Sequence, residues 1–256
     1  EQRKDTFIQN ISHELRTPLG IVLGHAELLE SGMLGDLEAA QQESIGIVAR
    51  RVQMLVALVE DLSVMLAAQT QEFRREMLHP KQMVDAMLAD FHLQAEARGL
   101  QLVAQVAEKL PWIRGDSTHL RRVFDNLMSN AFKFTPQGGQ VQLTVWQQEG
   151  NVLFEVRDTG MGMPANQLTH IFDRFYQVKY KDHVHPGGTG LGLSLVKEIV
   201  EAHRGEIRVE SEEGRGAAFI IRLPGVIHEE APALEHGDGG AGEALGDLDA
   251  RGEGVA

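Results

Sequence analysis

One histidine of this chain, His13, has neighbours that mark it as a candidate for covalent modification. Apolar residues recur at spacings of three and four between Ile8 and Leu29, which predicts a helix. His13 falls on the helix face opposite these residues, Glu14 follows it directly, and Thr17 lies one turn further on. The other ten of the eleven histidines have no comparable setting. A lone surface histidine is more often a solvated polar residue, so that alternative stays open at this point.

Three polar residues share one face of another predicted helix, within residues 120–134. Asn126, Asn130 and Lys133 follow one another at intervals of four and three positions, whereas the apolar residues of this helix form a separate stripe. Asparagine is unfavourable inside a helix, so two of them on one face need a reason. Amide oxygens can bind a hard cation, and the lysine ammonium can bind phosphates. The alternative is a solvated polar face.

A predicted strand, VLFEVRD (152–158), ends on a carboxylate that faces the core. Alternation places Asp158 on the same side as the apolar residues of the strand. A carboxylate that points inward needs a hydrogen-bond donor, which the amino group of adenine can supply and the carbonyl of guanine cannot. Gly160 and Gly162 follow and permit close approach of the backbone. The alternative is an Asp-Thr-Gly turn that is capped by its own side chain.

A glycine-rich segment, GGTGLGLSLVKEIV (187–200), opens directly into a predicted helix. Free backbone N–H groups and the helix N-terminus form a binding site for anions there. A glycine-rich loop by itself is weak evidence of a ligand. Together with the asparagine face and Asp158, in this order within one domain, it predicts a nucleotide-binding site.

Two amphipathic helices are expected to carry His13. The first ends near residue 30, a glycine-containing turn follows at residues 31–36, and apolar residues then repeat in heptads from Ile45 to Leu66. This pattern predicts an antiparallel hairpin over residues 1–69. Its apolar surface is wider than one seam, so we expect two copies to pair as a dimeric four-helix bundle. The alternative is that the hairpin packs on the C-terminal part of its own chain.

The pattern changes after the hairpin, and residues 70–226 are expected to form a second domain. Mixed strands with helices on one side predict an α+β two-layer sandwich. Strands are expected at residues 73–78, 100–106, 112–116, 141–146, 152–158, 206–210 and 217–223, and helices at 81–98, 117–134 and 191–203. Residues 227–256 are rich in glycine, alanine and acids without periodicity, which predicts a disordered acidic tail.

The composition excludes several classes of function. A net charge of −13 argues against a partner nucleic acid. The absence of cysteine excludes disulfides and thiolate metal sites, and it fits a reducing compartment. No apolar run approaches the roughly 18 residues that cross a bilayer, so no membrane contact is expected. The chain begins at Glu1 inside a charged helical pattern, so we expect a fragment whose upstream part is missing.

These motifs resemble those of one family. The run SHELRTPL around His13 resembles the phosphoacceptor box of the sensor histidine kinases of two-component systems. The asparagine face, Asp158 with its glycines, and the glycine-rich loop resemble the N, G1 and G2 boxes of the GHKL ATP-binding fold. IFDRFYQV (171–178) resembles the F box that is specific to histidine kinases. The resemblance extends over residues 4–224.

The resemblance implies a cytoplasmic homodimer that uses ATP and Mg²⁺ to phosphorylate His13. Any membrane tether would lie in the missing upstream part. The phosphoryl group would pass to an aspartate in the receiver domain of a response regulator. Glu14 would activate His13, and Thr17 would orient water for the reverse, phosphatase reaction.

The resemblance also implies a set of nucleotide-binding residues. Asn130 would bind Mg²⁺ with Asn126 beside it, and Asp158 would bind adenine. Residues 179–187 would form a lid over ATP. The remaining contacts are expected from Lys133, Gly160, Gly162, Arg174, Gly188, Thr189, Gly190, Leu191, Gly192 and Leu193.

One position separates this chain from related ATPases. Type II topoisomerases and mismatch-repair proteins resemble this helix but carry a glutamate, four residues before the metal-binding asparagine, that activates water. Asn126 stands at that position here and cannot act as a base, which favours phosphoryl transfer over hydrolysis. Two alternatives remain: an ATPase of the same fold with His13 incidental, and a non-catalytic dimeric scaffold that binds ATP.

Overall fold

The computed structural model describes residues 2–70, 73–178 and 189–226, and within these ranges it does not describe the side chains of residues 2–14, 62 and 65–70. The predicted acidic tail (227–256) and the predicted lid (179–187) lie outside the described residues. None of the described helices is long and apolar enough to cross a membrane.

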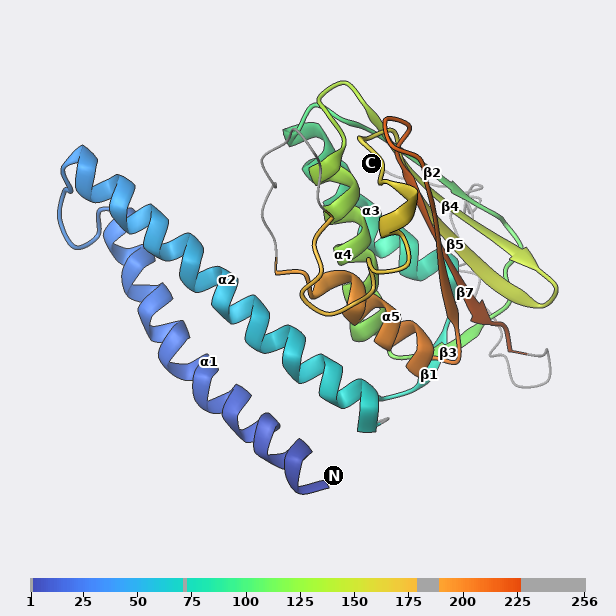
Figure 1. Ribbon diagram of the computed structural model, residues 1–256, viewed down its shortest axis with the longest axis horizontal. Helices are drawn as coiled ribbons and strands as arrows, with labels where there is room; N and C mark the ends of the chain where they lie inside the picture. Colours follow the sequence, from blue (N-terminus) through green and yellow to red (C-terminus); the bar gives the residue numbers. More distant parts are fainter. Residues whose placement is uncertain (1, 71–72, 179–188, 227–256) are drawn as a thin grey trace, which may run out of the picture.

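The N-terminal part is an antiparallel helical hairpin. Helix α1 (Gln2–Glu30) and helix α2 (Ala39–Thr70) lie side by side, with the turn between them at one end of the molecule (Figure 1). Several apolar side chains of the hairpin are exposed, among them Ile21 and Leu55. The hairpin therefore does not bury all of its apolar surface within one chain.

The C-terminal part is a sandwich of one helical layer and one five-stranded sheet (Figure 1). The helices are α3 (Pro80–Ala97), α4 (Ser117–Phe134) and α5 (Gly192–Ala202). The strands follow the order β2 (Gln101–Val106), β4 (Gln140–Gln148), β5 (Asn151–Asp158), β7 (Ala217–Pro224) and β6 (Glu206–Ser211), of which only β2 and β4 pair in parallel. Strands β1 (Glu76–Leu78) and β3 (Ile113–Gly115) form a separate ribbon, and a 3₁₀ turn spans Ala165–Gln167. The expected α+β sandwich is confirmed.

The sequence patterns that predicted α4 and β5 also account for the core between the layers. Leu120, Phe124, Leu127 and Ala131 of α4 are all buried, as their spacing predicted. The inward residues of β5 are buried against them, and the rings of Phe124 and Phe154 lie 5.1 Å apart. This packing fixes α4 over the middle of the sheet and holds its asparagine face at the side of the core.

A buried polar cluster joins the start of the sandwich to the end of α5. The carboxylate of Asp116 caps α4 by accepting the N–H of His119, and it also accepts the N–H of Arg74. Nε2 of His203 accepts the N–H of Asp116 at 3.0 Å, and the other ring nitrogen lies 2.7 Å from the carbonyl of Ile199. This geometry requires a neutral imidazole that donates through Nδ1.

Lowering the pH is expected to destabilise the sandwich through His203. Burial lowers the pKa of His203 below its usual value, so the unfolded chain binds the proton more readily than the folded chain. This contribution to stability is present above the unfolded pKa of about 6.5 and is lost as the pH falls through the folded pKa. Urea unfolding near pH 7.5 and pH 5.5 measures the difference.

The His203→Gln variant is the control, because glutamine does not titrate. Its pH dependence should be flatter than that of the wild type, although burial also lowers the pKa of His79 and leaves a remaining slope of the same sign. An equal slope in variant and wild type would contradict this assignment.

Candidate functional site

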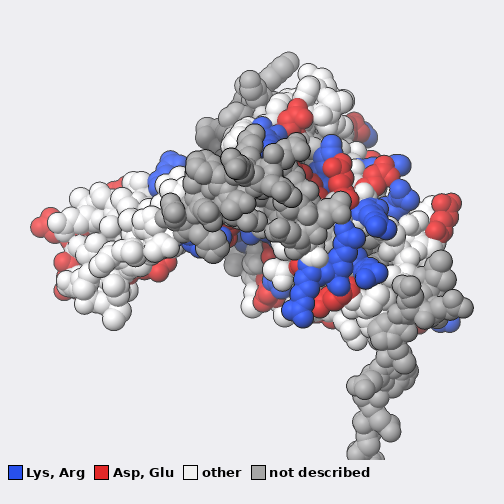
Figure 2. Space-filling model, turned by 90° about the horizontal axis from the view of Figure 1, so that it is seen from below, with Lys and Arg blue, Asp and Glu red and all other residues white. Residues whose placement is uncertain are grey.

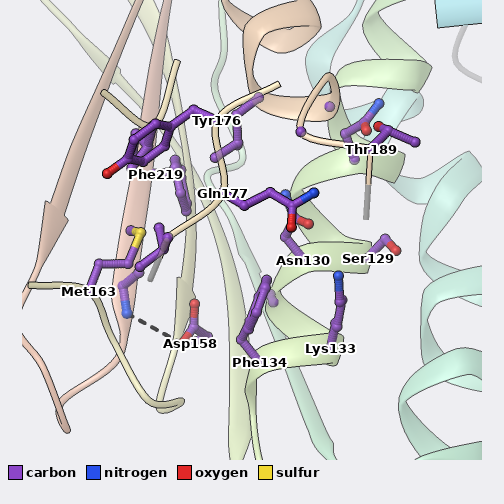
Figure 3. Close-up of a pocket in the computed structure, with 18 of the residues that line it drawn as sticks. Ser129, Asn130, Lys133, Phe134, Asp158, Met163, Tyr176, Gln177, Thr189 and Phe219 are labelled. Atoms are coloured by element: carbon purple, nitrogen blue, oxygen red, sulfur yellow. Dashed lines mark hydrogen bonds between the residues drawn. The ribbon is translucent and has the colours of Figure 1, made fainter. Parts of the chain in front are cut away.

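A cavity of about 360 Å³ lies between the helical layer and the segments that follow β5 and precede α5 (Figure 3). It brings together three stretches of sequence that were predicted to bind one ligand. The described residues that line it are Ala57, Asp61, Asn126, Ser129, Asn130, Ala131, Lys133, Phe134, Asp158, Gly162, Met163, Ile171, Tyr176, Gln177, Val178, Thr189, Gly190, Gly192, Leu193, Ala217 and Phe219.

The polar face of α4 forms one wall of this cavity. Asn126, Asn130 and Lys133 all line it, which confirms that these three residues share one face. The Asn126 side-chain nitrogen donates to the carbonyl of Arg122 at 2.9 Å. A Cβ atom on Gly192 would stand 2.6 Å from the amide oxygen of Asn126, so only glycine leaves room for this oxygen at the start of α5. Partial burial lowers the pKa of Lys133.

Asp158 lies at the opposite wall and is only 7% exposed. Its Oδ1 atom accepts the N–H group of Gly160 at 2.8 Å. It also accepts the N–H group of Ala217 at 3.3 Å, the bond that is dashed in Figure 3. The first of these bonds is the Asp-Thr-Gly turn that was the alternative explanation, and the same carboxylate nevertheless faces the cavity. Burial raises the pKa of Asp158. Both donors reach Oδ1, and no described residue donates to Oδ2.

The glycines after β5 have a structural reason that the sequence did not show. Gly162 has a φ of +63°, and a Cβ on it would stand 1.9 Å from the carbonyl oxygen of Glu212. A Cβ on Gly160 would stand 2.4 Å from the carbonyl oxygen of Phe134. Both glycines therefore admit neighbouring backbone of the protein itself, and Gly162 also lines the cavity.

The glycine-rich loop borders the cavity just before α5. Thr189, Gly190, Gly192 and Leu193 line it, whereas Leu191 is buried in the core, and Gly188 lies outside the described residues. Gly190 has a φ of +72°, and its carbonyl accepts the N–H of Phe175 at 2.8 Å. This bond ties the loop to the segment 171–178.

Arg174 does not line the cavity in this structure. Its guanidinium pairs with Glu198 of α5, with Nη2 2.5 Å from the carboxylate. Its neighbours Tyr176 and Gln177 line the cavity instead, and sequence reasoning had not singled them out (Figure 3). It also missed the apolar walls at Met163 and Phe219, since nothing in their local sequence distinguishes them from ordinary core residues.

The expected phosphoacceptor region lies on α1. His13 and Glu14 fall within this helix, but their side chains are outside the described part of the structure. Thr17 is described and exposed, one turn further along the helix. The backbone of α1 places residue 13 along the helix axis.

Comparison with known proteins agrees with both parts of the chain. Residues 3–69 match the His Kinase A (phospho-acceptor) domain, and residues 115–227 match the histidine kinase-, DNA gyrase B-, and HSP90-like ATPase domain. The sensor protein SrrB of Staphylococcus aureus (strain MRSA252) is 34% identical over 226 residues, which are 88% of this chain and 38% of SrrB. The chain thus spans well under half the length of this relative.

Solved structures also resemble this chain. Full-length ShkA, in a crystal structure with AMPPNP, matches 86% of this chain and 46% of its own chain, with a TM-score of 0.71 and 30% identity. The mycobacterial sensor histidine kinase MprB matches 59% of this chain and 98% of its own chain, with a TM-score of 0.51 and 28% identity. A phosphoacceptor hairpin followed by this ATPase fold places the chain in the family of two-component sensor histidine kinases.

Proposed function

We propose that this chain is an ATP-dependent protein histidine kinase that phosphorylates His13 and passes the phosphoryl group to an aspartate of a response-regulator receiver domain. The observation that carries the proposal is the single cavity lined by the asparagine face of α4, Asp158 and the glycine-rich loop. Residues 1–69 would act as the dimerisation and acceptor domain and residues 70–226 as the catalytic domain, in the cytoplasm.

The side chains around the cavity fit a magnesium nucleotide at both ends. Oδ2 of Asp158 would accept a hydrogen bond from the amino group of adenine. Asn130 would bind Mg²⁺ with Asn126 beside it, and Mg²⁺ when bound would neutralise charge on the phosphates. Lys133 and the N-terminal end of α5, at Gly190 and Gly192, would bind the phosphates as cation and N–H donors. The cavity thus offers amide groups for Mg²⁺, and an ammonium and backbone N–H groups for the phosphates.

The reaction would transfer a phosphoryl group from an oxygen of ATP to a ring nitrogen of His13. A ring nitrogen of His13 would form the new bond to the γ-phosphorus while the bond from that phosphorus to the bridging oxygen breaks, and ADP leaves. Glu14 would accept a hydrogen bond from the other ring nitrogen and stabilise the positive charge that develops on the ring. The binding residues contribute mainly by positioning, as is usual for phosphoryl transfer.

A homodimer would bury the apolar surface that one hairpin leaves exposed. Ile21 is 59% exposed and Val22 46%, and on α2 Val48 and Leu55 are exposed to similar extents. Figure 2 shows few charged side chains along the visible length of the hairpin, whereas basic and acidic groups are interspersed on the sandwich. A four-helix bundle of two hairpins would cover this surface.

Incubation with γ-labelled ATP and Mg²⁺ tests the proposal. The expected result is label on the protein that is labile in acid and stable in base, which is characteristic of phosphohistidine. Rapid phosphate release without labelled protein would show an ATPase instead. Nucleotide binding with neither release nor label would show a scaffold.

Replacement of Thr17 by alanine is expected to slow the reverse reaction by roughly tenfold or more without preventing phosphorylation of His13. Thr17 is exposed on α1 one turn beyond His13, where its hydroxyl could orient a water molecule for dephosphorylation of the regulator. Loss of phosphate from a phosphorylated regulator, with wild type and variant side by side, measures this. Equal rates would remove Thr17 from the phosphatase reaction.

A further inference from the structure

Helix α2 supplies part of the wall of the nucleotide cavity. Ala57 and Asp61, one turn apart on α2, line the cavity together with residues of the sandwich. Leu58 and Val64 on the same side of α2 pack against the core of the sandwich, and α2 lies directly against α5. The structure therefore holds the catalytic domain on the hairpin, in contact with the helix that does not carry His13.

An ion pair fastens this contact at one edge of the cavity. Nη2 of Arg122 on α4 lies 2.6 Å from Oδ1 of Asp61 and 3.7 Å from Oε2 of Glu60. Asp61 is 8% exposed, and burial raises its pKa, while the bond to Arg122 acts in the opposite direction. Burial of a carboxylate without a cation beside it costs free energy, so loss of Arg122 from this position would weaken the contact between α2 and the sandwich.

Arg122 is linked to the residues expected to hold the phosphates. It precedes Asn126 by one turn, and its carbonyl accepts the Asn126 side chain at 2.9 Å. The carboxylate of Asp61 thus lines the same cavity as Asn126, Asn130 and Gly192. The Mg²⁺ complex of a nucleoside triphosphate, which keeps a net negative charge, would be repelled by Asp61 and Glu60 and would attract Arg122.

The same contact separates the cavity from His13 of its own chain. In Figure 1, α2 lies between α1 and the sandwich. Leu29 of α1 and Ile45 of α2 border one groove, so residue 13, sixteen positions before Leu29, lies at the level of Asp61, sixteen positions after Ile45. The cavity lies at the level of residue 13 along the hairpin, but it faces α2.

We propose that the pair of Arg122 with Asp61 and Glu60 is a nucleotide-sensitive latch, which holds the catalytic domain on α2 and opens when ATP phosphates compete for Arg122. Release would let the domain move from α2 toward a phosphoacceptor histidine. The latch rests on the proposed function, because it requires that the cavity bind a nucleotide.

The latch can be tested by nucleotide affinity and by a distance. Asp61→Asn should bind the Mg²⁺ complex of AMPPNP about tenfold more tightly, since repulsion is removed and Arg122 is freed. Arg122→Gln breaks the same pair but leaves both carboxylates in place, so its affinity should not rise. Asp125→Asn is the matched control, because Asp125 pairs with Arg121 on the same helix at 3.0 Å and does not line the cavity.

The distance is measured between spin labels on cysteines introduced at Gln42 of α2 and Gln105 of β2. Both positions are exposed and the chain has no other cysteine. In dimers mixed with excess unlabelled chain, AMPPNP should shift the wild-type distance distribution, and Asp61→Asn and Arg122→Gln should show that shift without nucleotide.

AMPPNP binding by the wild type with no shift, together with an unshifted Asp61→Asn variant, would overturn the latch. Failure of the wild type to bind AMPPNP would overturn the proposed function instead. In that case a shifted distance distribution in Asp61→Asn without nucleotide would show that the pair still holds the domain on α2. An unshifted distribution would show that the pair does not hold it there.

Discussion

Replacing His13 by glutamine is expected to abolish the acid-labile label that the wild type acquires from γ-labelled ATP. Glutamine keeps a polar side chain on α1 but has no ring nitrogen that can form a bond to phosphorus. Loss of a covalent nucleophile typically costs several powers of ten in rate, so the residual label should fall below about 0.1% of the wild type. Autoradiography after denaturing electrophoresis measures it.

His25→Gln is the matched control, because His25 is a second histidine on the same helix and is exposed. It should be labelled like the wild type. Nucleotide affinity should be unchanged in His13→Gln, since the cavity lies in the sandwich and on α2 and none of the described side chains of α1 lines it. Equal labelling of His13→Gln and wild type would place the acceptor elsewhere and refute the central role of this residue.

Local periodicity was sufficient to predict the parts of the site that sit on regular elements. The stripe at Leu120, Phe124 and Leu127 determined which side of α4 is buried, and hence that Asn126 and Asn130 face away from the core. Alternation along β5 likewise placed Asp158 inward. These predictions succeeded because burial of one face decides the orientation of every residue in such an element.

Contacts between distant segments were not predictable in this way. The pairing of Arg174 with Glu198 joins residues 24 positions apart, and nothing in either segment marks the other as its partner. Nothing in the heptad pattern of α2 marks Asp61 as buried, yet the structure shows it buried against Arg122. The setting of His203 depends on a backbone N–H 87 positions earlier in the chain.

The hairpin shows that one of two opposed alternatives holds in part and still leaves apolar surface for the other. Pairing of two hairpins and packing on the catalytic domain were opposed as explanations of its apolar surface. The structure has Leu58 on α2 packed against the sandwich, while Ile21 and Val48 stay exposed. A helix with apolar residues on more than one face can serve two interfaces, so amphipathicity alone could not choose between them.

Asp158→Asn is expected to weaken ATP binding by about 10-fold to 100-fold with little loss of stability. The N–H groups of Gly160 and Ala217 both donate to Oδ1, so the asparagine oxygen should take that place and turn its NH₂ group toward the ligand. The NH₂ group of the asparagine and the amino group of adenine, both donors, would then face each other, and a charge-assisted hydrogen bond worth about 1.5–3 kcal/mol would be lost.

The same change should affect guanine nucleotides in the opposite direction. Guanine has a carbonyl where adenine has its amino group, so the asparagine NH₂ can donate to it. Titration of wild type and variant with ATP and GTP should therefore show the preference for ATP narrowing or reversing, while the thermal midpoint of the nucleotide-free protein stays close to the wild-type value. A folded variant with unchanged affinity for ATP would show that Asp158 only caps its own turn.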